Sequence, residues 1–220
     1  LRQEGISVFK GVRYGAPPRR FQPPETPAAW RDPVRATAYG AATPQRGDEP
    51  NQSEDCLFLN VWTPGTDAAK RPVMVYIHGG GYSGGSGSHP LYDGVRLATA
   101  GDVVVVTLDH RLNVFGYAYL VRLGPRFAGS GNVGQLDLIL ALQWVRDNIA
   151  AFGGDPARVM VFGQSGGGAK IATLMATPAA RGLFHSAATM SGQQVTAQGP
   201  INGTTRATAC RTPRSAMRGK

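Results

Sequence analysis

Five short apolar runs, separated by polar and glycine-rich stretches, divide the chain into candidate strands. They fall at residues 57–62, 73–77, 103–108, 159–162 and 186–190, and each has the length of a buried strand. Before the fourth run, apolar residues recur near helical spacing from Gly134 to Phe152, and Gly153 and Gly154 end the pattern. Strands that alternate with helices predict an α/β fold, with a mostly parallel sheet and helices on both faces.

Ser165 lies at one junction between a predicted strand and a predicted helix. It stands in Gly163-Gln164-Ser165-Gly166-Gly167, directly after the apolar run 159–162. A nucleophile elbow has this form, because the flanking glycines leave room for a sharp turn and the helix N-terminus faces the exposed hydroxyl. In a chain with 30 glycines, the same pattern also fits an ordinary glycine-rich turn.

A second glycine-rich motif favours the nucleophile elbow over an ordinary turn. The apolar run 73–77 leads directly into His78-Gly79-Gly80-Gly81-Tyr82, which has the form of the loop that supplies oxyanion donors in esterases and lipases. Both motifs end an apolar strand, and sites in open α/β sheets form at the carboxyl ends of strands. Preorganised N–H groups around a developing oxyanion contribute about 3 kcal/mol or more. The pair of motifs therefore favours a catalytic role for Ser165.

Longer segments follow the same order as in a known family. They are Phe9–Tyr14, Glu54–Pro64, Arg111–Gly116, Gly131–Gly134, Phe152–Pro156 and Gly163–Gly167. On these segments, from about Gly5 to about Gly199, the chain resembles the type B carboxylesterase family, which includes cholinesterases and para-nitrobenzyl esterase-like enzymes. The resemblance implies an α/β-hydrolase fold, truncated after the nucleophile-elbow region, and a serine carboxylic ester hydrolase acting on a small-molecule ester.

The resemblance also implies roles for individual residues. Ser165 would be the acyl-enzyme nucleophile, and the N–H groups of Gly80, Gly81 and Gly166 would form the oxyanion hole. It implies neither a metal nor an organic cofactor. Gly166 departs from the more usual alanine, and only its N–H is needed there.

Other departures concern the packing around the site and the choice of substrate. Gln164 replaces the commoner glutamate, and Asp109 and His110 replace Asn-Tyr. In cholinesterases the residue that binds choline-type cations would fall between Tyr39 and Cys56, and no aromatic residue occurs there. A quaternary ammonium substrate is therefore unsupported.

The other two members of a catalytic triad are not evident in the sequence. Hydrolases of this fold order the triad as Ser, then Asp or Glu, then His, and the last acidic residue of this chain is Asp155. His185 opens a predicted strand, so we expect a surface histidine far from the elbow, and His110 precedes the nucleophile. We expect His78 to support the glycine loop. The chain is thus interpreted as a fragment with little activity; the alternative is a non-catalytic relic or a cholinesterase-like binding protein.

The basic charge of the chain gathers toward its end. The net charge is +9, yet residues 1–155 carry 15 Lys and Arg against 14 Asp and Glu, while residues 156–220 carry eight against none. We predict that residues 1–203 form the N-terminal part of the hydrolase domain and that residues 204–220 are a disordered or spurious tail. A nucleic-acid arm is the alternative, disfavoured because no aromatic residue is interleaved for stacking. No stretch has the length and apolarity of a membrane span.

Two nucleotide-binding patterns fail on their context. Gly79, Gly81 and Gly84 match the dinucleotide fingerprint, but residues 83–90 contain Gly, Ser and Pro where a helix must begin. A P-loop starting at Gly163 fails because Lys170 comes one place too late.

Cysteine usage bears on the compartment. Cys56 stands where the family often places half of a disulfide, but the upstream partner is missing, so we expect a free, buried thiol. The lack of a disulfide framework favours a reducing, cytoplasmic compartment. A signal peptide would stand before Leu1, outside the sequence shown.

Overall fold

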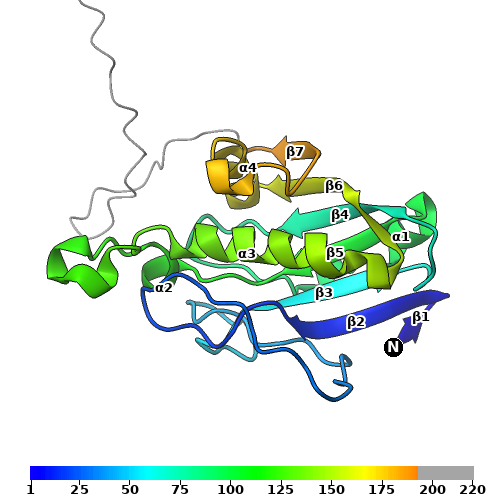
Figure 1. Cartoon of the computed structure of the whole chain (residues 1–220), viewed down its shortest axis with the longest axis horizontal. Helices are drawn as coiled ribbons and strands as arrows, with labels where there is room; N and C mark the ends of the chain where they lie inside the picture. Colours follow the sequence, from blue (N-terminus) through cyan, green and yellow to red (C-terminus); the bar gives the residue numbers. More distant parts are fainter. Residues whose placement is uncertain (193–220) are drawn as a thin grey trace, which may run out of the picture.

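A seven-stranded mixed sheet forms the centre of residues 1–192, the part of the chain that the computed structural model describes (Figure 1). The strands are β1 (Arg2–Gln3), β2 (Ile6–Arg13), β3 (Phe58–Thr63), β4 (Arg71–Ile77), β5 (Val104–Leu108), β6 (Gly154–Gln164) and β7 (Ser186–Met190), in the spatial order β1-β2-β3-β5-β4-β6-β7. Pairing is antiparallel from β1 to β5 and parallel from β5 through β4 and β6 to β7. Five strands therefore run in one direction, which agrees with the predicted α/β sheet. The predicted tail at residues 204–220 and its boundary at 203 lie outside the described residues.

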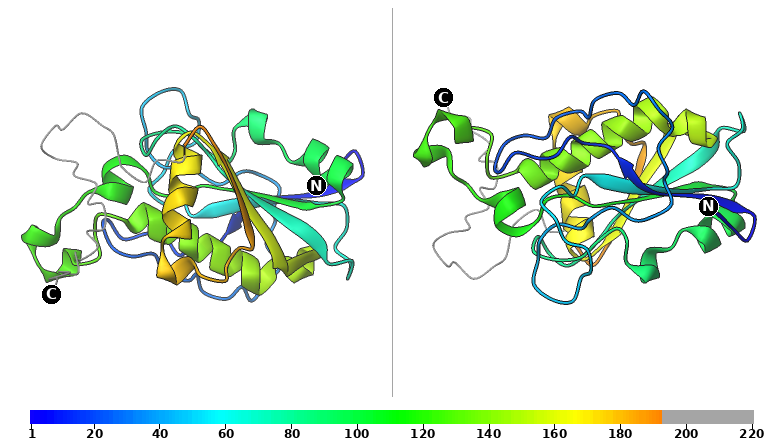
Figure 2. Two further views of the ribbon diagram at one scale, coloured as in Figure 1. Left: turned by 90° about the horizontal axis from the view of Figure 1, so that it is seen from above. Right: turned by 90° about the horizontal axis from the view of Figure 1, so that it is seen from below.

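Helices cover both faces of the sheet (Figure 2). They are α1 (Val95–Gly101), α2 (Asn113–Tyr117), α3 (Val133–Asn148) and α4 (Gly166–Met175), with 3-10 turns η1 (Pro90–Tyr92), η2 (Val121–Leu123), η3 (Pro125–Phe127), η4 (Ile149–Phe152) and η5 (Pro178–Ala180). The predicted helix 134–152 corresponds to α3 and η4, and Gly153 at φ 76° closes η4. No helix in the described range combines the length and apolarity needed to cross a membrane.

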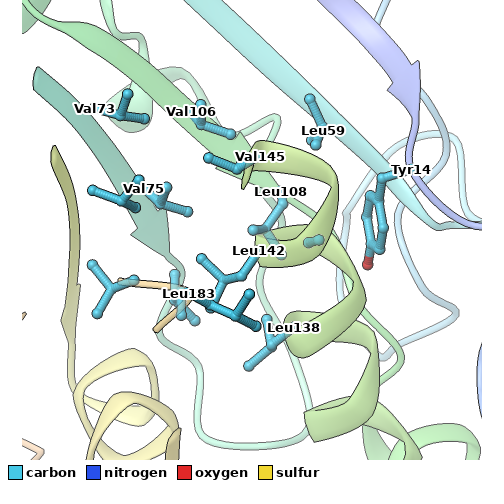
Figure 3. Packing of buried hydrophobic residues seen from close by; sticks show 14 of the residues in the cluster. Tyr14, Leu59, Val73, Val75, Val106, Leu108, Leu138, Leu142, Val145 and Leu183 are labelled. Carbon is cyan, nitrogen blue, oxygen red and sulfur yellow. The ribbon is translucent and has the colours of Figure 1, made fainter. Parts of the chain in front are cut away.

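Two hydrophobic cores lie on opposite faces of the sheet. In the larger core, Leu138, Leu142 and Val145 of α3 pack against Val75 and other strand residues (Figure 3). In the smaller core, α1 packs against Trp62 and residues of β2 and β5. All five residues of β5 are buried, because this central strand is covered on both faces. That explains why the central strands read as continuous apolar runs and not as alternating patterns.

Two strands escaped the sequence pattern, the two-residue β1 and the longer β2. β2 (Ile6–Arg13) pairs with β3, but its register shifts between Phe9 and Val12. Gly11 lies in this irregular stretch with φ 68°, and its N–H donates to Asn60 Oδ1 at 3.0 Å. Because a bulge breaks the period-two alternation of side chains, the pattern of apolar residues does not reveal such a strand.

Candidate active site

The structure places Ser165 on a sharp turn between β6 and α4. Its backbone has φ 55° and ψ −121°, a conformation that non-glycine residues rarely adopt. The Ser165 N–H donates to the carbonyl of Met190 at 2.7 Å, and the Ser165 carbonyl accepts from Ala169 at 3.1 Å. The strained turn is therefore fixed to the end of β7 on one side and to the first turn of α4 on the other.

The glycines on either side of Ser165 are required by close backbone packing. A methyl group on Gly163 would lie 2.6 Å from the carbonyl oxygen of Ile77, and one on Gly167 would collide with the same oxygen. Both contacts are closer than a carbon atom tolerates, so a side chain at either position would push the turn away from β4. The elbow thus fits directly against the strand that leads into the glycine loop.

The glycine loop lies against the elbow. A methyl group on Gly79 would stand 3.6 Å from Cβ of Ser165, and one on Gly166 would stand 2.6 Å from the nitrogen of Gly81. Gly80 and Gly81 have φ values of 84° and 62°, which glycine adopts without strain. The structure therefore brings Ser165, the loop and Gly166 together.

This arrangement suits the stabilisation of negative charge. Gly80 and Gly81 are exposed, Ser165 is partly exposed and Gly166 is buried, so a ligand can approach the serine from the side of the loop. Gly166 is the first residue of α4, whose N-terminal N–H groups and dipole favour an anion. Chemically, the site offers a hydroxyl next to backbone donors on a strained turn.

Two buried histidines stand behind the glycine loop. The rings of His78 and His110 lie 4.7 Å apart, and neither makes a hydrogen bond to Ser165 within the described residues. Burial, and then the charge of Lys170, lower the pKa of His78 to about 3 and that of His110 well below its usual value. Neutral His78 donates through Nδ1–H to the Gly79 carbonyl at 2.9 Å, which agrees with the expected support of the loop.

The two substituted residues after β5 have separate structural surroundings. Asp109 accepts from the Gly87 N–H at 3.0 Å, and burial raises the pKa of Asp109 to about 8. His110 lies fully buried with no hydrogen bond to its ring in the described structure. Arg111, which follows them, forms a buried ion pair with Asp137 of α3 at 2.6 Å. The region behind the site is therefore unusually rich in buried polar groups.

His185 lies at the opposite end of the sheet from Ser165. It precedes β7, is exposed, and accepts through Nδ1 from the Val159 N–H at 3.2 Å. Val159 lies before the Met160 and Ser186 pair that begins the β6 and β7 ladder, whereas Ser165 follows its last pair. His185 therefore holds the entrance of a strand, as a structural residue would.

Further features of the described residues concern Cys56, possible metal ligands and Lys170. Cys56 is free and buried, and accepts from the Thr43 hydroxyl at 3.1 Å. No group of three or more His, Cys, Asp or Glu side chains between residues 1 and 192 is placed to hold a metal ion. The polar residue that the sequence did not single out for this site is Lys170, which is completely buried in α4. The available signal was its position in the buried helical stripe with Gly167, Ile171 and Leu174.

Comparison with protein families gives a match over nearly the whole chain. Residues 1–212 match the model of the carboxylesterase family. The chain is 49% identical over 201 residues to the para-nitrobenzyl esterase of Bacillus subtilis (strain 168), which covers 86% of this chain and 41% of that protein. It is 42% identical over 202 residues to the phenmedipham hydrolase of Pseudarthrobacter oxydans, covering 84% of this chain and 39% of the relative.

The similar solved structures are also esterases. A carboxylesterase of Geobacillus stearothermophilus superposes with a TM-score of 0.83 at 48% identity, over 86% of this chain and 40% of the other. An esterase from Clostridium hathewayi superposes with a TM-score of 0.82 at 50% identity, over 87% of this chain and 41% of the other. The chain thus spans about 40% of the length of these relatives. With the α/β-hydrolase sheet, the elbow and the family match together, the chain belongs to the carboxylesterase family.

Proposed function

We propose that this chain carries the nucleophile and oxyanion hole of a serine carboxylic ester hydrolase. The observation that supports the proposal is the contact between the strained Ser165 turn and the glycine loop. In this account the Ser165 oxygen attacks the ester carbonyl and the alcohol leaves, which produces an acyl-serine. Water then attacks the acyl carbon and releases the acid, which restores the hydroxyl.

The proposed oxyanion hole consists of the N–H groups of Gly80, Gly81 and Gly166. Their arrangement is fixed before substrate arrives, because Gly166 belongs to α4 and the loop is anchored at His78. Preorganised donors of this kind typically lower the barrier by about 3 kcal/mol or more. Small-molecule esters are the proposed substrates, in line with the name of the related para-nitrobenzyl esterase.

Efficient turnover requires a base that residues 1–192 do not supply to Ser165. Its hydroxyl has no hydrogen-bond partner in that range, His185 lies at the far end of the sheet, and no acidic residue follows Asp155. β7 is the edge strand of the sheet and is mostly exposed, so further strands of a longer hydrolase could pair with it. We infer that the acid and the histidine come from the segment of the relatives that this chain does not span.

A chimera tests the proposal. Residues 1–192 are joined to the remaining C-terminal part of the Bacillus subtilis para-nitrobenzyl esterase, and hydrolysis of para-nitrophenyl acetate is measured beside the 220-residue chain. The chimera should turn over the ester, whereas the isolated chain should remain near its Ser165→Ala variant. In a comparable serine hydrolase, loss of triad members lowers kcat by ~10⁶.

The alternative is a non-catalytic relic or a cholinesterase-like binding protein. A correctly folded chimera without esterase activity would favour that alternative. Activity that persists in the Ser165→Ala chimera would contradict the proposed role of Ser165. Ser186→Ala, on the exposed edge strand, is the matched control and should leave the rate unchanged.

A further inference from the structure

Lys170 occupies a position where an apolar side chain is expected. Its side chain is completely buried on the inner face of α4, next to Ile171 and Leu174 in the helical stripe that packs on the sheet. An ammonium group loses its hydration there, which is costly unless other groups replace the water. The contacts of this side chain therefore indicate what it does.

The ammonium of Lys170 contacts both ends of the glycine loop. Its Nζ donates to the carbonyl of His78 at 3.3 Å, where the loop begins. It also lies 5.6 Å from the centre of the Tyr82 ring, where the loop ends, within the range of a cation–π interaction. One side chain thus spans the segment that carries Gly80 and Gly81.

No carboxylate balances this charge among residues 1–192, where every ion pair involves other residues. The groups around Lys170 are His78 at the end of β4, His110 after β5, Tyr82 of the loop, and Gln135 of α3, whose amide donates to the Lys170 carbonyl at 2.9 Å. Both histidines are neutral. The loop carbonyl and the Tyr82 ring are therefore the partners of the ammonium.

We propose that Lys170 is a positioning residue that fixes the glycine loop against the nucleophile turn and thereby directs the N–H groups of Gly80 and Gly81. The role rests on the proposed function, because the loop matters for catalysis only if it is the oxyanion hole. The position of the loop itself can be measured without any catalysis.

The charge of Lys170 should make this positioning depend on pH. Burial lowers the pKa of Lys170 to about 7. Because the pKa is lowered, the buried site as a whole favours the neutral amine, which still donates to the His78 carbonyl. Protonation below that pH places a poorly solvated charge behind the loop, so the loop should be held most firmly on the alkaline side of pH 7. Burial raises the pKa of Asp109 to about 8, so the test must distinguish the titration of Asp109 from that of Lys170.

The test follows the loop and the lysine together by NMR. The sequence contains only four lysines, at positions 10, 70, 170 and 220, so a sample of the 220-residue chain with ¹³C-labelled lysine resolves the titration of Lys170. The amide signals of Gly79, Gly80 and Gly81 are followed in parallel from pH 5.5 to 9.5. We expect the Lys170 ε-carbon and the loop amides to share a midpoint near pH 7.

Variants assign the effect to the side chain. Lys170→Met should abolish the loop response near pH 7 and raise hydrogen exchange of the loop amides above pH 7 by about fivefold, the factor that a hydrogen bond of ~1 kcal/mol represents. Lys70→Met, at an exposed position, should change neither, and Asp109→Asn should preserve the response. If Lys170→Met does not fold, the wild-type titration still shows whether the loop amides respond when Lys170 titrates.

Two results would overturn the proposal. One is a Lys170 signal that titrates without any change in the loop amides. The other is a loop response near pH 7 that persists in Lys170→Met or disappears in Asp109→Asn. Because no readout depends on ester hydrolysis, these results are distinct from a failure of the esterase proposal.

Discussion

Gly166 and Gly81 lie in backbone contact, so close that an alanine methyl at position 166 would stand 2.6 Å from the Gly81 nitrogen. The first residue of α4 and the third glycine of the loop are thus fitted to each other. An alanine is more usual at position 166 in the family that the sequence resembles. In this chain the absence of that methyl lets the loop pack directly on the nucleophile turn.

Replacing Gly166 by alanine should therefore displace the loop. Crowding of this kind typically costs about 1–3 kcal/mol, offset by up to ~1 kcal/mol of improved helix propensity. We expect Gly166→Ala to lower the free energy of unfolding in urea by about 1 kcal/mol and to shift the amide signals of Gly80 and Gly81. Gly101→Ala in α1, where the nearest atom is the Val103 side chain at 3.3 Å, is the control. Equal stability of the two variants would contradict the proposed fit.

The backbone of Ser165 should store measurable strain. Non-glycine residues at unfavourable positive φ cost ~1–3 kcal/mol, and glycine relieves this at the expense of a more flexible unfolded chain. Ser165→Gly should therefore be more stable than Ser165→Ala by about 1 kcal/mol in urea unfolding. At Ser83, an exposed residue outside the positive φ region, the alanine variant should instead be more stable than the glycine variant. If alanine is the more stable residue at both positions, the turn is not strained.

Sequence patterns predicted those parts of the fold that depend on local signals. The central strands appear as apolar runs because both faces are buried, and the elbow and glycine loop appear because their close packing excludes side chains. β2 was missed because its bulge interrupts the alternation. The burial of Lys170 was not predicted, because its partners His78 and Tyr82 lie 92 and 88 positions earlier in the chain and only the folded sheet brings them together.

The ion pair between Arg111 and Asp137 should be essential for stability. Asp137 is completely buried and accepts from the Arg111 backbone and guanidinium at 2.6–2.9 Å. Asp137→Asn leaves a buried guanidinium without its counter-charge, so we expect a loss of about 3–5 kcal/mol, measured by urea or thermal unfolding. The exposed pair of Arg146 and Asp147 provides the control, and Asp147→Asn should have no measurable effect. A small effect of Asp137→Asn would mean that solvent reaches this site.

Acid should destabilise the fold through its buried histidines. Because burial holds the pKa of His110 well below its usual value and that of His78 at about 3, the folded state stays unprotonated at both residues as pH falls from about 6.5 toward 4, while the unfolded state binds protons. Each histidine then removes about 1.4 kcal/mol of stability per pH unit. Asp109 acts in the opposite direction: because its pKa is raised in the folded state, its contribution to the free energy of unfolding increases as pH falls.

His110→Phe isolates one of these contributions. The contribution of Asp109 is common to both proteins, so the slope of unfolding free energy against pH should decrease by about 1.4 kcal/mol per unit between pH 4 and 6. At pH 7.5 histidines are mostly neutral in both the folded and the unfolded state. The difference in unfolding free energy between His110→Phe and the wild-type protein at this pH therefore measures the change in packing alone. An unchanged slope would mean that His110 is protonated in the folded protein.

The most direct measurement of the central claim is the identity of the acylated residue. The chimera described above is quenched during turnover of a para-nitrophenyl ester, or treated with an organophosphate, and its tryptic peptides are analysed by mass spectrometry. Cleavage after Arg158 and Lys170 gives the peptide of residues 159–170, whose only serine is Ser165. The adduct should be found on this peptide and be absent in Ser165→Ala. Ester turnover with the adduct on another peptide, or with labelling that persists in Ser165→Ala, would contradict the account.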